Sequence, residues 1–153
     1  MDALIKKLQY TAGVPVVLAQ LPAEQAALQS WFARNAPLIA PESGAKAGFA
    51  LLFVRSQAQI DQWVPQLAAC LEGDALFWCC YPKSSSKRYR CDFNRDTGWA
   101  IFGQLGYEPV RQVAIDEDWS ALRFRKVAYI KKITRSKSMA LTDEARQRTS
   151  SSQ

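Results

Sequence analysis

Three continuous apolar runs, separated by segments with helical spacing, constrain the fold of this chain more than any other feature. The runs are "GVPVVLAQ" at 13–20, "FALLFV" at 49–54 and "ALFWCCY" at 75–81. An uninterrupted apolar strand is typical of a sheet covered on both faces, whereas a strand with one wet face alternates apolar and polar residues. We therefore expect these runs to form buried strands of a mainly parallel sheet.

The segments after the runs have the periodicity of helices. Residues 21–37 and 57–71 place apolar side chains on one face, and residues 96–105 begin at an aspartate suited to an N-cap. Pro65 predicts a kink or the start of a second short helix, and Gly73 predicts a C-terminal stop. Each apolar strand is thus expected to lead into a helix.

The C-terminal part of the pattern predicts a hairpin. "YEPVRQVAI" (107–115) and "WSALRFRKV" (119–127) read as strands joined by the short link "DED" (116–118). The whole order predicts a single-domain α/β three-layer sandwich, mainly parallel, with an antiparallel C-terminal hairpin. Periodicity weakens from about Ala128. We therefore divide the chain into a domain at 1–127 and a basic, partly flexible tail at 128–153, with a short helix expected near Thr142.

The absence of histidine excludes several classes of active site. Among 153 residues there is none, so neither a Ser-His-Asp triad nor a Cys-His dyad can be built, and mixed Cys/His zinc sites are excluded. The four cysteines include the adjacent pair Cys79 and Cys80, whose side chains point to opposite faces of a strand. We therefore expect reduced, mostly buried thiols and no metal site.

The charge is distributed unevenly along the chain. Residues 1–77 carry five basic and six acidic side chains, a net of −1, and residues 78–153 carry fifteen basic and eight acidic, a net of +7. This asymmetry favours an anionic partner. No apolar run approaches the roughly 18 residues that cross a bilayer, and Lys6 and Lys7 interrupt the N-terminal segment. We expect a cytoplasmic protein with no membrane contact, and the sequence leaves its oligomeric state open.

One stretch concentrates basic residues directly after the third apolar run. It reads "YPKSSSKRYRCDFNRD" (81–96) and leaves a strand at the sheet edge where α/β proteins bind their ligands. Hydroxyl groups, lysines and arginines together suit a phosphate or another small anion, although the glycines of a P-loop are missing. A solvated surface loop is the alternative interpretation. The candidate anion-binding residues are Lys83, Ser84, Ser85, Ser86, Lys87, Arg88 and Arg90.

A second basic stretch suggests nucleic-acid binding as another function. It runs from 123 to 137 without an acidic residue and includes one tyrosine that could stack on a base. A solvated charged face is again the simpler interpretation. The candidate residues are Arg123, Arg125, Lys126, Tyr129, Lys131, Lys132 and Arg135.

The remaining polar and aromatic features favour structural roles. The "DED" link at 116–118 could hold Mg²⁺, but neighbouring carboxylates rarely converge on one ion and acids are common in turns, so we expect a turn and no metal site. Trp78, Trp99 and Trp119 lie on expected elements and predict core anchors. Tyr81 either closes the core or stacks on a ligand.

Longer segments of the sequence resemble known proteins. "FALLFVRS", "GDALFWCCYPK" and "GWAIFGQLGYEPVRQVAIDEDWSALRFR" resemble the later half of class I S-adenosylmethionine-dependent methyltransferases. Residues 1–145 are similar to a family of small bacterial proteins of unknown function that carry "YPK-S-SK", "NRD-GW" and "DEDWSALRFR" segments. The resemblance implies a Rossmann-like domain and, in the first case, a methyltransferase with S-adenosylmethionine as cofactor.

The cofactor devices of the methyltransferases are missing from this sequence. A glycine-rich turn should follow the first strand, where the chain reads "LAQLPAEQ", and a carboxylate should end the next strand, where it reads "FVRS" with Arg55. We therefore predict a non-catalytic binding or regulatory module without a cofactor, which contacts a small anionic or phosphate-bearing partner through residues 81–96. A nucleic-acid-associated protein and a divergent methyltransferase are the alternatives.

Overall fold

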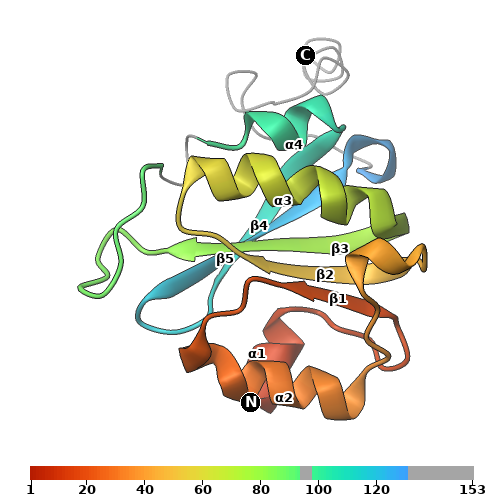
Figure 1. Cartoon of the computed structure of the whole chain (residues 1–153), viewed down its shortest axis with the longest axis horizontal. Helices are drawn as coiled ribbons and strands as arrows, with labels where there is room; N and C mark the ends of the chain where they lie inside the picture. Colours follow the sequence, from red (N-terminus) through yellow and green to blue (C-terminus); the bar gives the residue numbers. More distant parts are fainter. Residues whose placement is uncertain (94–97, 131–153) are drawn as a thin grey trace.

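The computed structural model describes residues 1–93 and 98–130, and it has an α/β fold with three layers. In chain order the elements are α1 (Asp2–Lys7), β1 (Val16–Ala19), η1 (Ala23–Gln25), α2 (Ala26–Asn35), η2 (Pro41–Ser43), β2 (Ala47–Phe53), α3 (Gln57–Cys70), β3 (Leu71–Pro82), α4 (Ala100–Gln104), β4 (Tyr107–Ala114), β5 (Trp119–Lys126) and η3 (Val127–Tyr129). The sheet lies between α3 and α4 on one face and α1 and α2 on the other (Figure 1). The predicted fold class is confirmed.

The five strands follow the order β1-β2-β3-β5-β4. β1, β2 and β3 are parallel, with Leu51 beside Leu18 on one side and Trp78 on the other. β5 is antiparallel to both β3 and β4, so the predicted C-terminal hairpin is present and its second strand inserts between β3 and β4. The predicted tail beyond Ile130, including the expected helix near Thr142, lies outside the described residues.

The chain changes direction across the sheet after β1. It leaves β1 through α2 and forms a single parallel bridge on the outer side of β1, between Val16 and Leu38. The Val16 amide donates to the Pro37 carbonyl at 2.8 Å, and the Ile39 amide donates to the Val16 carbonyl at 2.9 Å. The chain then returns to the other side of β1 as β2. Because strand connections of this kind are right-handed, reversing the direction puts α2 and α3 on opposite faces.

Two apolar clusters, one on each face of the sheet, form the core. Alternate residues of β3 serve the two faces. Phe77 packs with Phe102 and Tyr107 on the α3 side. Trp78 is fully buried on the α1 side, where its indole N–H donates to the Leu8 carbonyl at 2.9 Å. Trp78, Trp99 and Trp119 are all buried, so their prediction as core anchors is confirmed.

Two local predictions in this region need correction. α3 runs through Pro65 as one helix, so no second helix starts there, and a kink at Pro65 stays a prediction. Gly73 does not stop that helix, because α3 ends at Cys70 and β3 begins at Leu71. Gly73 instead lies where the β2–β3 register slips, and its φ of +61° fits the irregular backbone that the slip requires. No helix in the described part of the chain is long and apolar enough to span a bilayer.

Candidate functional site

Four connections meet at the carboxyl edge of the parallel strands. β1 continues into Gln20, β2 into Arg55 and β3 into Lys83. The link at 116–118 reaches the same edge, because β5 begins opposite the last residue of β3. This edge, at the point where the chain reverses direction across the sheet, is where open α/β sheets bind ligands.

The basic loop, defined here as residues 83–90, is fastened to the β4–β5 link. The Lys83 amide donates to the Asp118 carbonyl at 2.8 Å, and the Ser86 hydroxyl donates to the Asp118 carboxylate at 2.8 Å. The Ser86 oxygen also accepts from the amides of Arg88 and Tyr89, each at 3.2 Å. Ser86, predicted as an anion contact, therefore holds the loop in shape and has its hydroxyl hydrogen engaged by a carboxylate.

The acidic link itself forms a turn. Asp116 Oδ1 accepts from the amides of Asp118 and Trp119 at 2.8 and 2.9 Å, and its Oδ2 accepts from the Gln25 side chain at 2.9 Å. Asx turns of this kind explain why acids are common in short links. Within the described ranges, no three His, Cys, Asp or Glu side chains gather as a metal ion would require.

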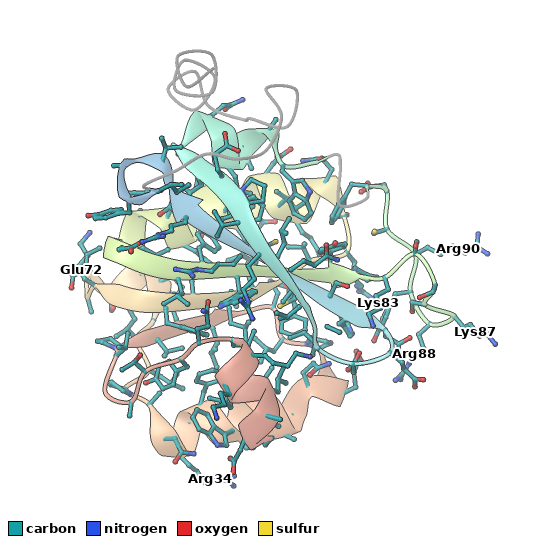
Figure 2. All side chains as sticks on the ribbon, turned by 180° about the vertical axis from the view of Figure 1, so that it is seen from behind. Arg34, Glu72, Lys83, Lys87, Arg88 and Arg90 are labelled. Carbon is teal, nitrogen blue, oxygen red and sulfur yellow. The ribbon has the colours of Figure 1, made fainter. Side chains whose placement is uncertain are left out.

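The positive side chains of the basic loop remain without carboxylate partners in the described part of the chain. Arg88 and Arg90 and the lysines Lys83 and Lys87 make no ion pair there, whereas Arg125 does. Figure 2 shows Lys87, Arg88 and Arg90 projecting from the end of the molecule. Four positive charges on one short loop repel one another, so a bound anion would relieve an unfavourable interaction.

A cavity of about 880 Å³ opens beneath the basic loop, and we call it the loop cavity. The loop contributes Lys83, Arg90 and the three serines, so Ser84 and Ser85 line it beside Ser86. Its floor is formed by Tyr81, Phe93, Gln112 and Ser120. Tyr81 is buried in the core and lines the cavity as well, and Gln112 donates to its hydroxyl at 3.2 Å. A cavity of this size suits a small organic molecule.

Tyr89 extends from the basic loop across the ends of β1 and β2. Its hydroxyl donates to the carboxylate of Glu24, and its ring centroid lies 5.1 Å from that of Trp119. Arg55 approaches the same ring, with its guanidinium carbon 5.4 Å from the centroid. The hydrogen bond that the Tyr89 hydroxyl donates to Glu24 raises the pKa of that hydroxyl, and burial adds to the effect while Arg88 and Arg55 oppose it.

The turn after β1 does not provide a cofactor cradle. Gln20 has a φ of +63°, the backbone conformation that glycine adopts without strain, but here it carries a side chain. Glycine at such turns lets the backbone approach a bound cofactor. In this chain the Tyr89 side chain also covers the region between Glu24 and Arg55. The residues present therefore do not fit S-adenosylmethionine in the manner of a glycine-turn enzyme.

Three of the four cysteines are buried in the core, and Cys91 is half-buried. No disulfide joins the four thiols, and Cys79 and Cys80 are fully buried. Burial raises the pKa of both thiols, which keeps them protonated and unable to act as nucleophiles or thiolate ligands. The prediction that they serve as packing thiols agrees with this geometry.

The two arginines of the second basic stretch that lie on β5 have partners away from the basic loop. Arg123 lies beside Trp78 of β3 and donates to Gln9 at 3.0 Å, and Arg125, two residues further along β5, pairs with Asp74 at 2.6 Å. Figure 2 shows Glu72, near the start of β3, at one end of the molecule and the basic loop at the other.

Of the other candidates for nucleic-acid binding, two lie on different elements of the described structure and three lie outside the described residues. Lys126 follows Arg125 on β5 and approaches the Tyr107 ring, at 5.9 Å from its centroid, on the α3 side. Tyr129 is exposed on η3. Lys131, Lys132 and Arg135 lie outside the described residues.

Sequence reasoning missed two residues of the carboxyl edge. Glu24 and Gln112 contact the basic loop or line its cavity but lie far from it in sequence, so they could be placed only once the strand order was known. Arg55 was noted only as a departure from the methyltransferase pattern, although it directly follows the second apolar run and was therefore expected at the ligand edge.

No family model matches this chain, and no curated protein matches it in sequence. The predicted similarity to a family of small bacterial proteins therefore stays a prediction. Solved structures do match its fold. A putative type 11 methyltransferase from Sulfolobus solfataricus superimposes with a TM-score of 0.54 at 10% identity, covering 88% of this chain and 96% of that one.

Two further matches extend the same comparison. The N-methyltransferase NodS from Bradyrhizobium japonicum WM9, in complex with S-adenosyl-l-homocysteine, gives a TM-score of 0.53 at 11% identity and covers 82% of this chain and 85% of that one. The pyocyanin biosynthetic protein PhzM gives 0.55 at 11% identity, covering 80% of this chain and 53% of that one, so the chain spans about half the length of that protein. The fold is Rossmann-like and methyltransferase-like. At these identities the likeness shows the fold alone.

Proposed function

We propose that this chain is a non-catalytic binding module that takes a phosphate-bearing or similar small anion at the carboxyl edge of its sheet. The observation that carries the proposal is the basic loop, whose lysines and arginines are unpaired in the described residues and border a cavity of about 880 Å³. Unpaired cations beside a cavity at the ligand edge of an α/β sheet favour an anionic ligand.

A divergent methyltransferase is the second candidate, and the structural matches favour it. Proteins with this fold include NodS, whose structure contains S-adenosyl-l-homocysteine. Against methyl transfer stand the side chain of Gln20 in the turn after β1 and the Tyr89–Glu24 contact across the crevice. Under this candidate, the cofactor would have to displace Tyr89 and bind without a glycine turn.

A thermal-shift screen separates the two candidates. The panel contains inorganic phosphate, nucleotides, sugar phosphates and S-adenosylmethionine at constant ionic strength. A ligand that binds only the native state raises the melting temperature, by an amount that corresponds to about 2.7 kcal/mol when it is present at 100 times its Kd. Stabilisation by phosphorylated compounds supports the binding module, and stabilisation by S-adenosylmethionine alone supports the methyltransferase.

The triple variant Lys83→Ala, Lys87→Ala, Arg88→Ala tests whether the basic loop is responsible. It should nearly keep its melting temperature without ligand, because Lys87 and Arg88 are exposed, Lys83 is half-buried, and none of the three has a carboxylate partner in the described residues. Surface changes of this kind usually cost within about 0.5 kcal/mol each, although the variant also loses the Arg88 contact with the Tyr89 ring. It should lose stabilisation by the anion. Arg34→Ala is the matched control, since Arg34 is exposed on α2, away from the basic loop (Figure 2). Unchanged ligand stabilisation in the triple variant would refute the proposed site.

A further inference from the structure

A second, smaller pocket adjoins the loop cavity at the end of β2. Its volume is about 350 Å³, and we call it the arginine pocket, defined by Arg55, Ser56, Gln59, Arg88, Tyr89 and Arg90. Three guanidinium groups from two separate connections therefore surround one hollow. None of the three is paired with a carboxylate in the described ranges.

The hydrogen bonds around the pocket occupy its acceptors and leave its donors unused. Gln59 Oε1 accepts from the Arg55 amide at 2.6 Å, and Ser56 Oγ accepts from the Gln59 amide at 3.2 Å. The Ser56 hydroxyl hydrogen and the Gln59 side-chain NH₂ make no hydrogen bond within the described residues. Together with guanidinium groups, which only donate, they give the pocket a surface of hydrogen-bond donors.

A surface made of donors selects a particular kind of ligand. Neutral hydroxyl or amide groups bring donors of their own, which would find few acceptors here. A fully ionised oxyanion brings acceptors only, and arginine recognises it with paired, charge-assisted hydrogen bonds. Three positive charges further favour a dianion over a monoanion.

Tyr89 and Arg90 line both the arginine pocket and the loop cavity. A ligand could therefore place its anionic group against Arg55, Arg88 and Arg90 while its organic part extends into the loop cavity. The loop cavity offers Ser84, Ser85 and Lys83 for polar contacts and the rings of Tyr81 and Phe93 for apolar ones.

We propose that the arginine pocket is the subsite for a dianionic phosphate group and that the ligand is a phosphomonoester whose organic part lies in the loop cavity. This inference rests on the proposed function, because it names the class of anion that the carboxyl edge binds. Arg55 lies outside the basic loop and lines the arginine pocket but not the loop cavity. A substitution at Arg55 therefore tests the arginine pocket separately from the loop cavity.

The experiment measures binding to the full-length chain by calorimetry at constant ionic strength. The probes are phenyl phosphate and glycerol phosphate as monoesters, dimethyl phosphate as a diester, and glycerol as a neutral counterpart. Both monoesters should bind, and the diester and glycerol should not. Because the second pKa of a phosphomonoester is about 6, affinity should rise from about pH 5 to about pH 7 as the dianion forms.

Three single variants, each lowering the positive charge by one, locate the phosphate. Arg55→Gln should weaken both monoesters by about 10- to 100-fold, the loss expected for a charge-assisted contact. Lys83→Gln, in the loop cavity, should change the preference between phenyl phosphate and glycerol phosphate and retain most of the affinity. Arg34→Gln controls for net charge and should bind as the original chain does.

The outcomes distinguish this inference from the proposed function. If monoesters bind and Lys83→Gln abolishes binding while Arg55→Gln does not, the phosphate lies in the loop cavity; the inference is then wrong and the proposed function stands. If no anion binds, both are wrong. If dimethyl phosphate binds as tightly as the monoesters, and affinity does not rise with pH, the dianion subsite is overturned in favour of phosphodiester binding.

Discussion

Tyr89 shows how one side chain changes what a fold can do. It comes from the connection after β3, yet its hydroxyl bonds to Glu24 after β1 and its ring lies beside Arg55 after β2. A phenylalanine would keep the packing against Trp119 but lose the bond to the carboxylate. The tyrosine therefore both fastens the basic loop and covers the crevice between the first two connections.

Tyr107 provides a test at the scale of a single ionisable group. It is buried against Phe77 and Phe102, and burial raises its pKa from 10.0 to about 12. Between pH 10 and about 12, the Tyr107 hydroxyl therefore stays neutral in the folded protein, whereas it ionises in the unfolded chain. Stability is therefore unaffected below pH 10 and should fall as the pH rises from 10 to about 12.

Tyr107→Phe should make that alkaline loss of stability shallower. The upper bound on the slope from one tyrosine is about 1.4 kcal/mol per pH unit, and solvent screening lowers it. Urea unfolding at about pH 9 and about pH 11 measures the difference between the original chain and the variant. Equal loss of stability in both proteins would show that Tyr107 ionises as freely when folded as when unfolded.

At the scale of elements, the apolar runs predicted the strands well because buried parallel strands require an unbroken apolar sequence. The runs at 49–54 and 75–81 became β2 and β3, each longer than its run. α1 and the bridge at Leu38 were not predicted. A six-residue helix is too short for its periodicity to be detected, and a bridge of one residue leaves no pattern at all.

The candidate site was predictable in its place but not in its contacts. Residues 83–90 follow a buried strand, so their position at the ligand edge could be inferred from sequence. The contacts of Ser86 with Asp118 and of Tyr89 with Glu24 depend on β5 inserting beside β3 and on β1 lying at the edge. Contacts between distant connections are set by strand order, which the sequence does not state.

Gly98 tests how the connection before α4 packs against α3. It has a φ of +89°, its carbonyl accepts from Gln57 at 3.0 Å, and an added Cβ would lie 2.9 Å from both the Gln57 side chain and Phe93 Cβ. Gly98→Ala should cost about 1–2 kcal/mol for the left-handed backbone and a further 1–3 kcal/mol or so for the overlap.

Gly44→Ala is the matched control for that substitution. Gly44 has a φ of +80°, but nothing lies within 4 Å of its added Cβ, so only the backbone cost should appear. The difference in urea unfolding midpoint between the two variants isolates the steric contribution. Equal destabilisation would mean that the Gln57 and Phe93 side chains move aside for an extra methyl group.

At the scale of the whole molecule, the sheet stops where a longer Rossmann-like sheet would continue. Beyond β1 there is one bridge at Leu38, after which the chain turns back through η2, whose Pro41 carbonyl lies near Cys70 at the end of α3. The chain therefore still reverses its direction across the sheet after β1, but no full strand lies outside β1 in the described part of the chain. On the outer side of β1, the carboxyl edge of the sheet is therefore bordered by the single bridge at Leu38 in place of a further strand.

S-adenosylmethionine binding tests that architecture directly. The original chain should show no measurable binding by calorimetry, because Tyr89 covers the crevice, Gln20 replaces a glycine, and the wall beyond β1 is a single bridge. Tyr89→Ala removes the first obstacle and leaves the other two, so it should bind no better. Micromolar affinity in the original chain would promote the methyltransferase candidate over the binding module. Micromolar affinity in Tyr89→Ala alone would show that the crevice is a competent cofactor site closed by one side chain, and that neither the turn after β1 nor the missing strands prevent binding.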